Sequence, residues 1–194
     1  PVLEASASIG PGPTLLDERM AKLRPHGPLV ILGGLRVGMT GPDEHVRMDA
    51  DQHMGALYPF SLTDKLARIT ENSPWYAGDT PWGGPVIPLE MVSVLAEYSS
   101  RQTAFPVLQP VVGLFADLEI SMLNGPLMVG RDYIIRREIV ALAESRRTES
   151  YWTRARIFDA SGKTQIAETL LNHAVLKQSL DGYDDKRAAL EAKE

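Results

Sequence analysis

The chain has 194 residues, of which 44% are hydrophobic and 23% are charged, so it can bury the core of one globular domain. Its formal net charge is -5, and so acidic a chain lacks the overall charge of a nucleic-acid binder. It contains no cysteine, which excludes disulfides, thiolate nucleophiles and cysteine-ligated metals.

No stretch of the sequence has the pattern of a membrane or export signal. The apolar runs are shorter than the roughly 18–20 residues that a membrane helix needs. The first residues, Pro1 to Glu4, lack the basic region and apolar core of a signal peptide. We therefore expect a cytoplasmic protein with neither a membrane nor a nucleic acid as its partner.

Proline and glycine recur throughout residues 1–59, which argues against a separate folded domain there. A short helix is predicted over residues 14–23 with Thr14 as its cap. The apolar run Leu29-Val30-Ile31-Leu32 predicts a short strand. We interpret residues 1–59 as an arm that wraps the following domain or its dimer partner.

Two helices are predicted next. Residues 61–69 begin with the capping hydroxyl of Ser61 and place Leu62, Leu66 and Ile69 at helical spacing. That helix should stop before Pro74, because the residue before a proline is pushed out of the α region. Residues 89–98 are apolar on most of their circumference, which is typical of a helix buried in the core.

From Val112 onward the hydrophobic period changes to two. Residues 112–122 alternate as a strand with one buried face, and long strands are predicted at 132–144, 148–159 and 164–177. Four consecutive long strands favour an antiparallel meander, and wrapping the sheet around the apolar helix is the best way to bury that helix. The fold class is therefore α+β, with a charged tail at residues 181–194.

The loop between the two predicted helices carries the most informative motif. It reads Glu71-Asn72-Ser73-Pro74-Trp75-Tyr76, followed by a turn rich in glycine and proline over residues 81–88. A second motif, residues 124–131, begins Asn-Gly-Pro and ends Val-Gly-Arg. Both motifs occur in the order and spacing of a known family.

Over residues 60–177 the chain resembles the MaoC-like hydratase/dehydratase family, and most closely its N-terminal-type dehydratase domains. That family has Gly-Asp-x-Asn-Pro-x-His before its central helix and Val-Gly-Asp in the later motif. Here Glu71 and Tyr76 stand where the family has its Asp and His, and Arg131 replaces the later Asp. The resemblance implies one hot-dog domain at residues 60–180, in which an antiparallel sheet wraps a buried central helix.

The resemblance also implies an activity and its partners. Members of the family add water to, or remove it from, acyl thioesters of coenzyme A or acyl carrier protein, without a cofactor or metal. Hot-dog units usually pair because a single small sheet leaves edges and apolar surface open, so we expect a homodimer or a heteromer with another hot-dog subunit. The implied catalytic residues are Glu71 and Tyr76, and the implied oxyanion and substrate-binding residues are Gly83, Gly84, Trp75, Trp82 and Asn72.

The chemistry of these residues leaves several functions open. Glu71 can act as a base, because an apolar cleft raises the pKa of a carboxyl group. Tyr76 is a weaker partner than His at neutral pH, since its reference pKa is about 10. The chain is therefore a hydratase with an altered acid–base pair, a non-catalytic subunit that binds thioesters and supports a catalytic partner, or a thioesterase. Gly83 and Gly84 either let the thioester approach the backbone at the start of the helix or simply form a tight turn.

Weaker signals have simpler interpretations. Acidic and histidine residues at positions 43–53 are metal-compatible but show no closed ligand set. His173 is interpreted as a packed, hydrogen-bonded residue of the last strand. The arginines of the strands either bind phosphate or pair with neighbouring glutamates, and pairing is the simpler reading; they are Arg131, Arg136, Arg137, Arg146, Arg147, Arg154 and Arg156, with Glu138, Glu144 and Glu149.

Overall fold

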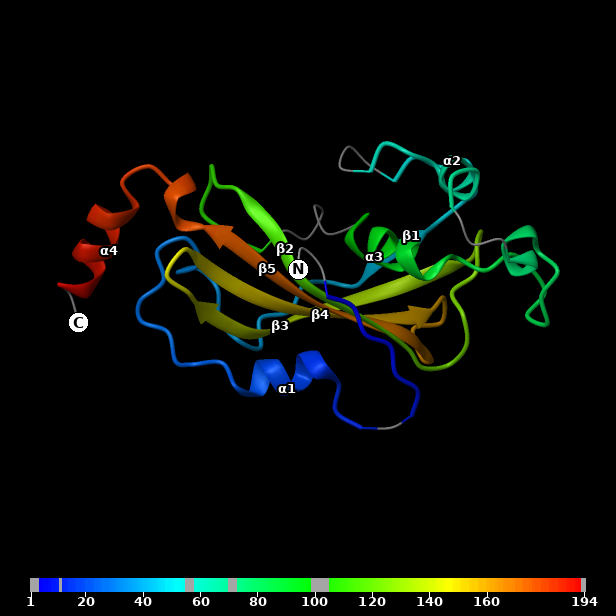
Figure 1. The fold of residues 1–194 in the computed structure, drawn as a ribbon, viewed down its shortest axis with the longest axis horizontal. Coiled ribbons are helices and arrows are strands. Elements are labelled where there is room, and N and C mark those ends of the chain that lie inside the picture. Colours follow the sequence, from blue (N-terminus) through cyan, green and yellow to red (C-terminus); the bar gives the residue numbers. More distant parts are fainter. Residues whose placement is uncertain (1–3, 11, 55–57, 70–72, 99–104, 193–194) are drawn as a thin grey trace.

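The computed structural model describes residues 4–10, 12–54, 58–69, 73–98 and 105–192. Its strands form one antiparallel sheet in the order β1-β3-β4-β5-β2. Helix α3 lies against one face of the sheet and α1 against the other (Figure 1). The elements are α1 Leu15–Ala21, β1 Glu44–Arg47, α2 Leu62–Leu66, α3 Leu89–Tyr98, β2 Gly113–Met122, β3 Asp132–Glu144, β4 Thr148–Asp159, β5 Gln165–Leu176 and α4 Tyr183–Glu191, with 3-10 helices at Pro74–Ala77 and Lys177–Ser179.

The predicted helices are confirmed, and their caps explain where they begin. Thr14 accepts the backbone N–H of Asp17 at the start of α1. Ser61 and Asp64 form a reciprocal capping box at the start of α2. Within the described part of the chain, no helix combines the length and the apolar character needed to cross a membrane.

The predicted four-strand meander is wrong in one respect. Strands β3, β4 and β5 follow one another across the sheet as expected. Strand β2, however, pairs with β5 rather than with β3, its successor in sequence. The reason is that residues 127–129 do not turn straight back into a hairpin but pair with residues 85–87 before β3 begins.

The main core lies between α3 and the sheet, as predicted. Met91, Val92, Leu95 and Ala96 of α3 are at most 1% exposed. Their burial accounts for the apolar character of the helix on most of its surface. They pack against sheet residues that point to the same face: Val46, Tyr133, Ile135, Ala155, Ile157 and Ala167.

A buried ion pair closes the far end of α3. Arg137 of β3 bonds both carboxylate oxygens of Glu44 in β1, at 3.2 and 3.0 Å, and also bonds Glu97 of α3 at 3.0 Å. The same guanidinium donates to the carbonyl oxygen of Ala96, at 2.6 Å. Because Arg137 and Glu44 are both almost fully buried, these bonds tie the helix end and β1 to the sheet.

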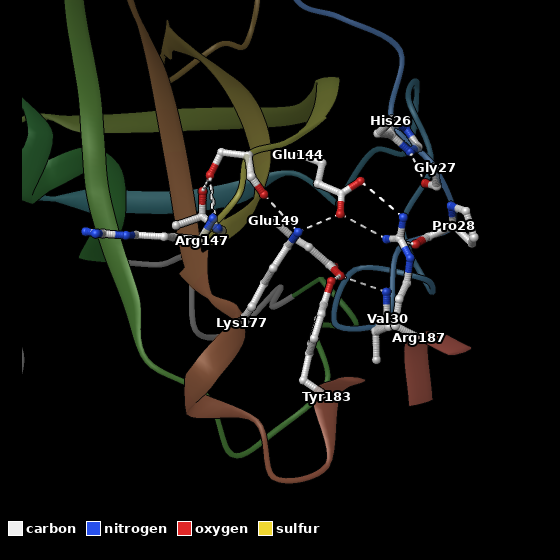
Figure 2. Close-up of polar contacts among 12 residues, drawn as sticks. His26, Gly27, Pro28, Val30, Glu144, Arg147, Glu149, Lys177, Tyr183 and Arg187 are labelled. Carbon is white, nitrogen blue, oxygen red and sulfur yellow. Dashed lines mark hydrogen bonds and ion pairs between the residues drawn. The ribbon is translucent and has the colours of Figure 1, made fainter. Parts of the chain in front are cut away.

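A second apolar cluster involves the segment that we predicted to be a strand at Leu29–Leu32. That prediction is wrong, because the segment has an irregular backbone. The backbone N–H groups of Val30, Ile31 and Leu32 donate instead to the carboxylate of Glu149, at 2.8, 3.0 and 2.9 Å. Glu149 is fully buried and also accepts the hydroxyl of Tyr183, at 2.8 Å, so one carboxylate holds the N-terminal segment and α4 to the sheet (Figure 2).

Strand β2 differs from its predicted burial. Its apolar residues Leu114, Leu118 and Met122 are 50%, 40% and 39% exposed, and Phe115 is 58% exposed. The predicted buried face is therefore wrong for this chain alone. The cause is position, because β2 is the last strand of the sheet and has a neighbour on one side only.

Candidate functional site

The loop before α3 is built around the side chain of Thr80. Its hydroxyl donates to the carbonyl oxygen of Gly84 at 2.6 Å, and the N–H groups of Trp82 and Gly84 approach the same hydroxyl at 3.3 and 3.4 Å. Gly83 has φ 78°, a conformation that side-chain-bearing residues rarely adopt. Glycine at this position is therefore required by the turn.

This loop is fixed to the connection between β2 and β3. The N–H of Ile87 donates to the carbonyl of Leu127 at 2.8 Å, and the N–H of Val129 donates to the carbonyl of Pro85 at 2.9 Å. Between them, the N–H of Met128 donates to the hydroxyl of Tyr133 at 2.7 Å. The two motifs of the sequence thus meet just before the start of β3.

The structure brings together several of the predicted site residues. Trp75 and Trp82 contact each other edge to face, with ring centroids 5.1 Å apart and planes at 89°. Both indoles are exposed, at 47% and 40%. Tyr76 follows Trp75 in the 3-10 helix and is partly buried. Their roles in substrate binding and catalysis stay predictions.

The other predicted residues fall in two groups. Gly83 and Gly84 lie in the Thr80 turn, and their N–H groups are directed at the carbonyl and hydroxyl oxygens of Thr80, at 3.3 and 3.4 Å. Glu71 and Asn72 lie outside the described residues. The predicted acid–base pair of Glu71 and Tyr76 is therefore described only at its tyrosine.

An open hollow of about 660 Å³ adjoins Trp82. Arg131 also lines this hollow, and its guanidinium donates to the carbonyl oxygen of Trp82 at 2.9 Å. Tyr133 lines the same hollow, as do Asn124 and Asp159. From the sequence, Arg131 was singled out as a departure from the family pattern and as one of the strand arginines, and Tyr133 was placed in a predicted strand without being given a role. A tyrosine two residues after the Val-Gly-Arg motif was the available signal.

The surroundings of two titratable residues of the hollow shift their pKa values in opposite directions. Burial raises the pKa of Tyr133, against the opposing effects of the Met128 N–H and of Arg131, so the phenol is protonated at neutral pH. The Ser161 hydroxyl, aided by the N–H groups of Thr164 and Lys163, lowers the pKa of Asp159 to about 2. Asp159 therefore serves its own hairpin turn.

The structure also shows the surroundings of the metal-compatible residues and of the strand arginines. Among the described residues, no three acidic or histidine side chains are grouped closely enough to hold a metal ion. Arg156 pairs with Glu138, as the simpler reading of the arginines predicts. Arg136 and Arg137 pair instead with Asp43 and Glu44, and the partners of Glu144 are Lys177 and Arg187. Glu149 departs from that reading, because backbone N–H groups and Tyr183 are its partners.

Comparison with known proteins gives a match in structure but none in sequence. No family model matches the chain, and a search of curated proteins finds no match. A MaoC-like dehydratase from Rhodospirillum rubrum superposes with a TM-score of 0.53 at 16% identity, over 76% of this chain and 97% of that one.

Two further solved structures agree. The HadBC (3R-hydroxyacyl-ACP dehydratase) complex from Mycobacterium tuberculosis gives a TM-score of 0.52 at 16% identity, covering 73% of this chain and 98% of that one. A monoamine oxidase regulatory protein from Archaeoglobus fulgius gives 0.52 at 13% identity, covering 77% and 94%. At the level of the fold, the resemblance inferred from the sequence is therefore confirmed: this chain has the hot-dog fold, in the form that MaoC-like dehydratases adopt.

Proposed function

We propose that the chain binds acyl thioesters of coenzyme A or acyl carrier protein and adds water to, or removes it from, the double bond beside the thioester. The observation that carries this proposal is the loop before α3. It has the glycine-rich turn that the family resemblance implies before the central helix, and it is hydrogen-bonded to residues 127–129 beside an open hollow. The similar dehydratases from R. rubrum and M. tuberculosis support the same class of reaction.

In this proposal the loop residues have distinct roles. Glu71 accepts or delivers the proton of water, and Tyr76 orients or protonates the other partner. Gly83 and Gly84 let the thioester approach the backbone near the start of α3, where free N–H groups favour a developing negative charge. Trp75, Trp82 and Asn72 line the acyl side of the site. The support for Glu71 and Asn72 is the sequence motif alone.

A panel of enoyl-CoA substrates tests this function through the loss of absorbance of the conjugated double bond. Glu71→Gln keeps the shape of the side chain and removes the base, so turnover should fall by about 10²–10⁴-fold. Asp79→Asn, an exposed carboxylate in the same loop, is the matched control and should keep wild-type turnover. Hydratase activity that survives Glu71→Gln undiminished would show that the site is misplaced.

A second candidate is a non-catalytic subunit that binds thioesters and supports a catalytic hot-dog partner. Two observations favour it: tyrosine replaces the family histidine at Tyr76, and the exposed apolar residues of β2 leave an edge open to a partner. An inactive wild type that gains hydratase activity in the variant Glu71→Asp with Tyr76→His would identify this candidate, because those changes restore a carboxylate–imidazole pair. Release of free thiol in the same assay would instead indicate a thioesterase.

A further inference from the structure

The hydroxyl of Tyr133 is fixed at the hollow with one hydrogen-bonding direction unused. Its oxygen accepts the N–H of Met128 at 2.7 Å, so the O–H hydrogen must point elsewhere. Within the described residues, that hydrogen has no acceptor. The residue is only 4% exposed, yet it lines the hollow beside Trp82. A held and desolvated donor of this kind is prepared to bond an oxygen atom that enters from the hollow.

Arg131 brings a positive charge to the same hollow. Its guanidinium is held by the carbonyl oxygen of Trp82, at 2.9 Å, and pairs with no carboxylate in the part of the chain that the structure describes. The two acidic residues that line the hollow have other partners. Asp132 faces Arg47 at 3.9 Å, and Asp159 accepts the donors of its own hairpin.

These two side chains act on one place. Arg131 directly precedes β3 and Tyr133 is the second residue of that strand, and both side chains line the hollow. The charge of Arg131 also acts on the phenol, because it opposes the rise of the Tyr133 pKa that burial causes. An O–H donor and a guanidinium therefore converge on the hollow that the Trp82 loop borders.

We propose that Tyr133 and Arg131 bind the thioester carbonyl oxygen of the substrate, as a pair of side-chain donors. This inference rests on the proposed function, in which negative charge develops on that oxygen as water adds or leaves. The N–H groups of Gly83 and Gly84 already have oxygen atoms of Thr80 within 3.3 and 3.4 Å. Because these two N–H groups bond within the turn, the side chains of Arg131 and Tyr133 supply the hydrogen bonds to the substrate.

The test uses butyryl-CoA labelled with ¹³C at its carbonyl, a saturated thioester that cannot be hydrated. Binding to the wild type should lower the carbonyl stretching frequency and move the ¹³C resonance downfield, since both respond to hydrogen bonds to the oxygen. Tyr133→Phe and Arg131→Met should each reduce these shifts and raise Kd about tenfold, the effect of one hydrogen bond. Arg131→Lys should keep part of the shift.

Controls separate binding from folding. Arg36→Met and Tyr98→Phe change an exposed arginine and an exposed tyrosine that do not line the hollow, and both should keep the wild-type shift and Kd. Because Tyr133→Phe also removes the acceptor of the Met128 N–H, its melting temperature is measured in parallel. Arg131→Met leaves that bond in place.

The outcomes separate a failure of this inference from a failure of the proposed function. If butyryl-CoA binds the wild type without a carbonyl shift, or if Tyr133→Phe and Arg131→Met keep the full shift, the inference is wrong and thioester binding stands. If no thioester binds the wild type, both the proposed function and this inference are overturned.

Discussion

The imidazole of His173 in β5 lies parallel to the phenol ring of Tyr151 in β4, with ring centroids 4.5 Å apart and 4° between the planes. Phe115 of β2 contacts the same imidazole edge to face, with ring centroids 5.5 Å apart. The Nε2 atom of His173 lies 3.1 Å from the hydroxyl of Thr153. The histidine is therefore packed and hydrogen-bonded within the sheet, as its place in the sequence predicted.

This packing predicts that stability falls on acidification. Burial, with a smaller effect of the Arg137 charge, lowers the pKa of His173 from 6.5 to about 4. The unfolded chain then binds the proton more readily than the folded one, so stability is lost as pH falls from about 6.5 to about 4. The loss is up to about 3 kcal/mol.

Urea unfolding of the wild type and of His173→Phe between pH 4.5 and 7.5 measures this effect. The other titrating groups are the same in both proteins, so the difference between the two unfolding free energies isolates the contribution of the histidine. As the pH falls, the unfolding free energy of the wild type should decrease relative to that of the variant. Parallel curves would show that His173 titrates normally in the folded protein.

The second prediction concerns the buried carboxylate of Glu149, shown in Figure 2. It accepts three backbone N–H groups and the hydroxyl of Tyr183, so Glu149→Gln places an N–H₂ donor against other donors. We expect a loss of about 2–4 kcal/mol in unfolding free energy. Faster hydrogen exchange at the amides of Val30, Ile31 and Leu32 should accompany it.

Two variants bracket that result. Tyr183→Phe removes a single hydrogen bond and should cost about 1 kcal/mol. Glu18→Gln changes an exposed glutamate of α1 and should stay within about 0.5 kcal/mol of the wild type. A Glu149→Gln protein as stable as Glu18→Gln would mean that the carboxylate does not anchor the N-terminal segment.

The elements that the sequence predicted best are those whose burial is set locally. The bounds of α3, β3 and β4 agree with the predicted ranges, because apolar residues at a period of 3.6 or 2 mark which face is buried. The prediction at Leu29–Leu32 was wrong because that segment has no such periodicity. A short apolar run alone does not distinguish a strand from an irregular segment. Its partner, Glu149, is far away in the sequence.

Pairing order and the candidate site were harder to predict. Nothing in residues 113–122 tells whether β2 pairs with β3 or with β5, because both neighbours would satisfy the same alternation. The loop of Trp75 and Trp82 was found from a motif. Tyr133 was missed, since its hydroxyl gains meaning only when Met128 and Arg131 are placed around it.

The last prediction follows from the open edge of β2, where Phe115 and Leu118 are 58% and 40% exposed. An edge strand with exposed apolar side chains is a surface that proteins normally cover, so we expect the chain to assemble through β2 with a second copy or with another hot-dog subunit. Leu118→Lys puts a charge in the middle of that strand and should shift the assembly to a single chain, measured by light scattering at micromolar concentration. Leu15→Lys changes a leucine of α1 that is 64% exposed and should leave the mass unchanged. A wild type that has the mass of one chain, and that recovers no partner in a pull-down, would contradict the assembly.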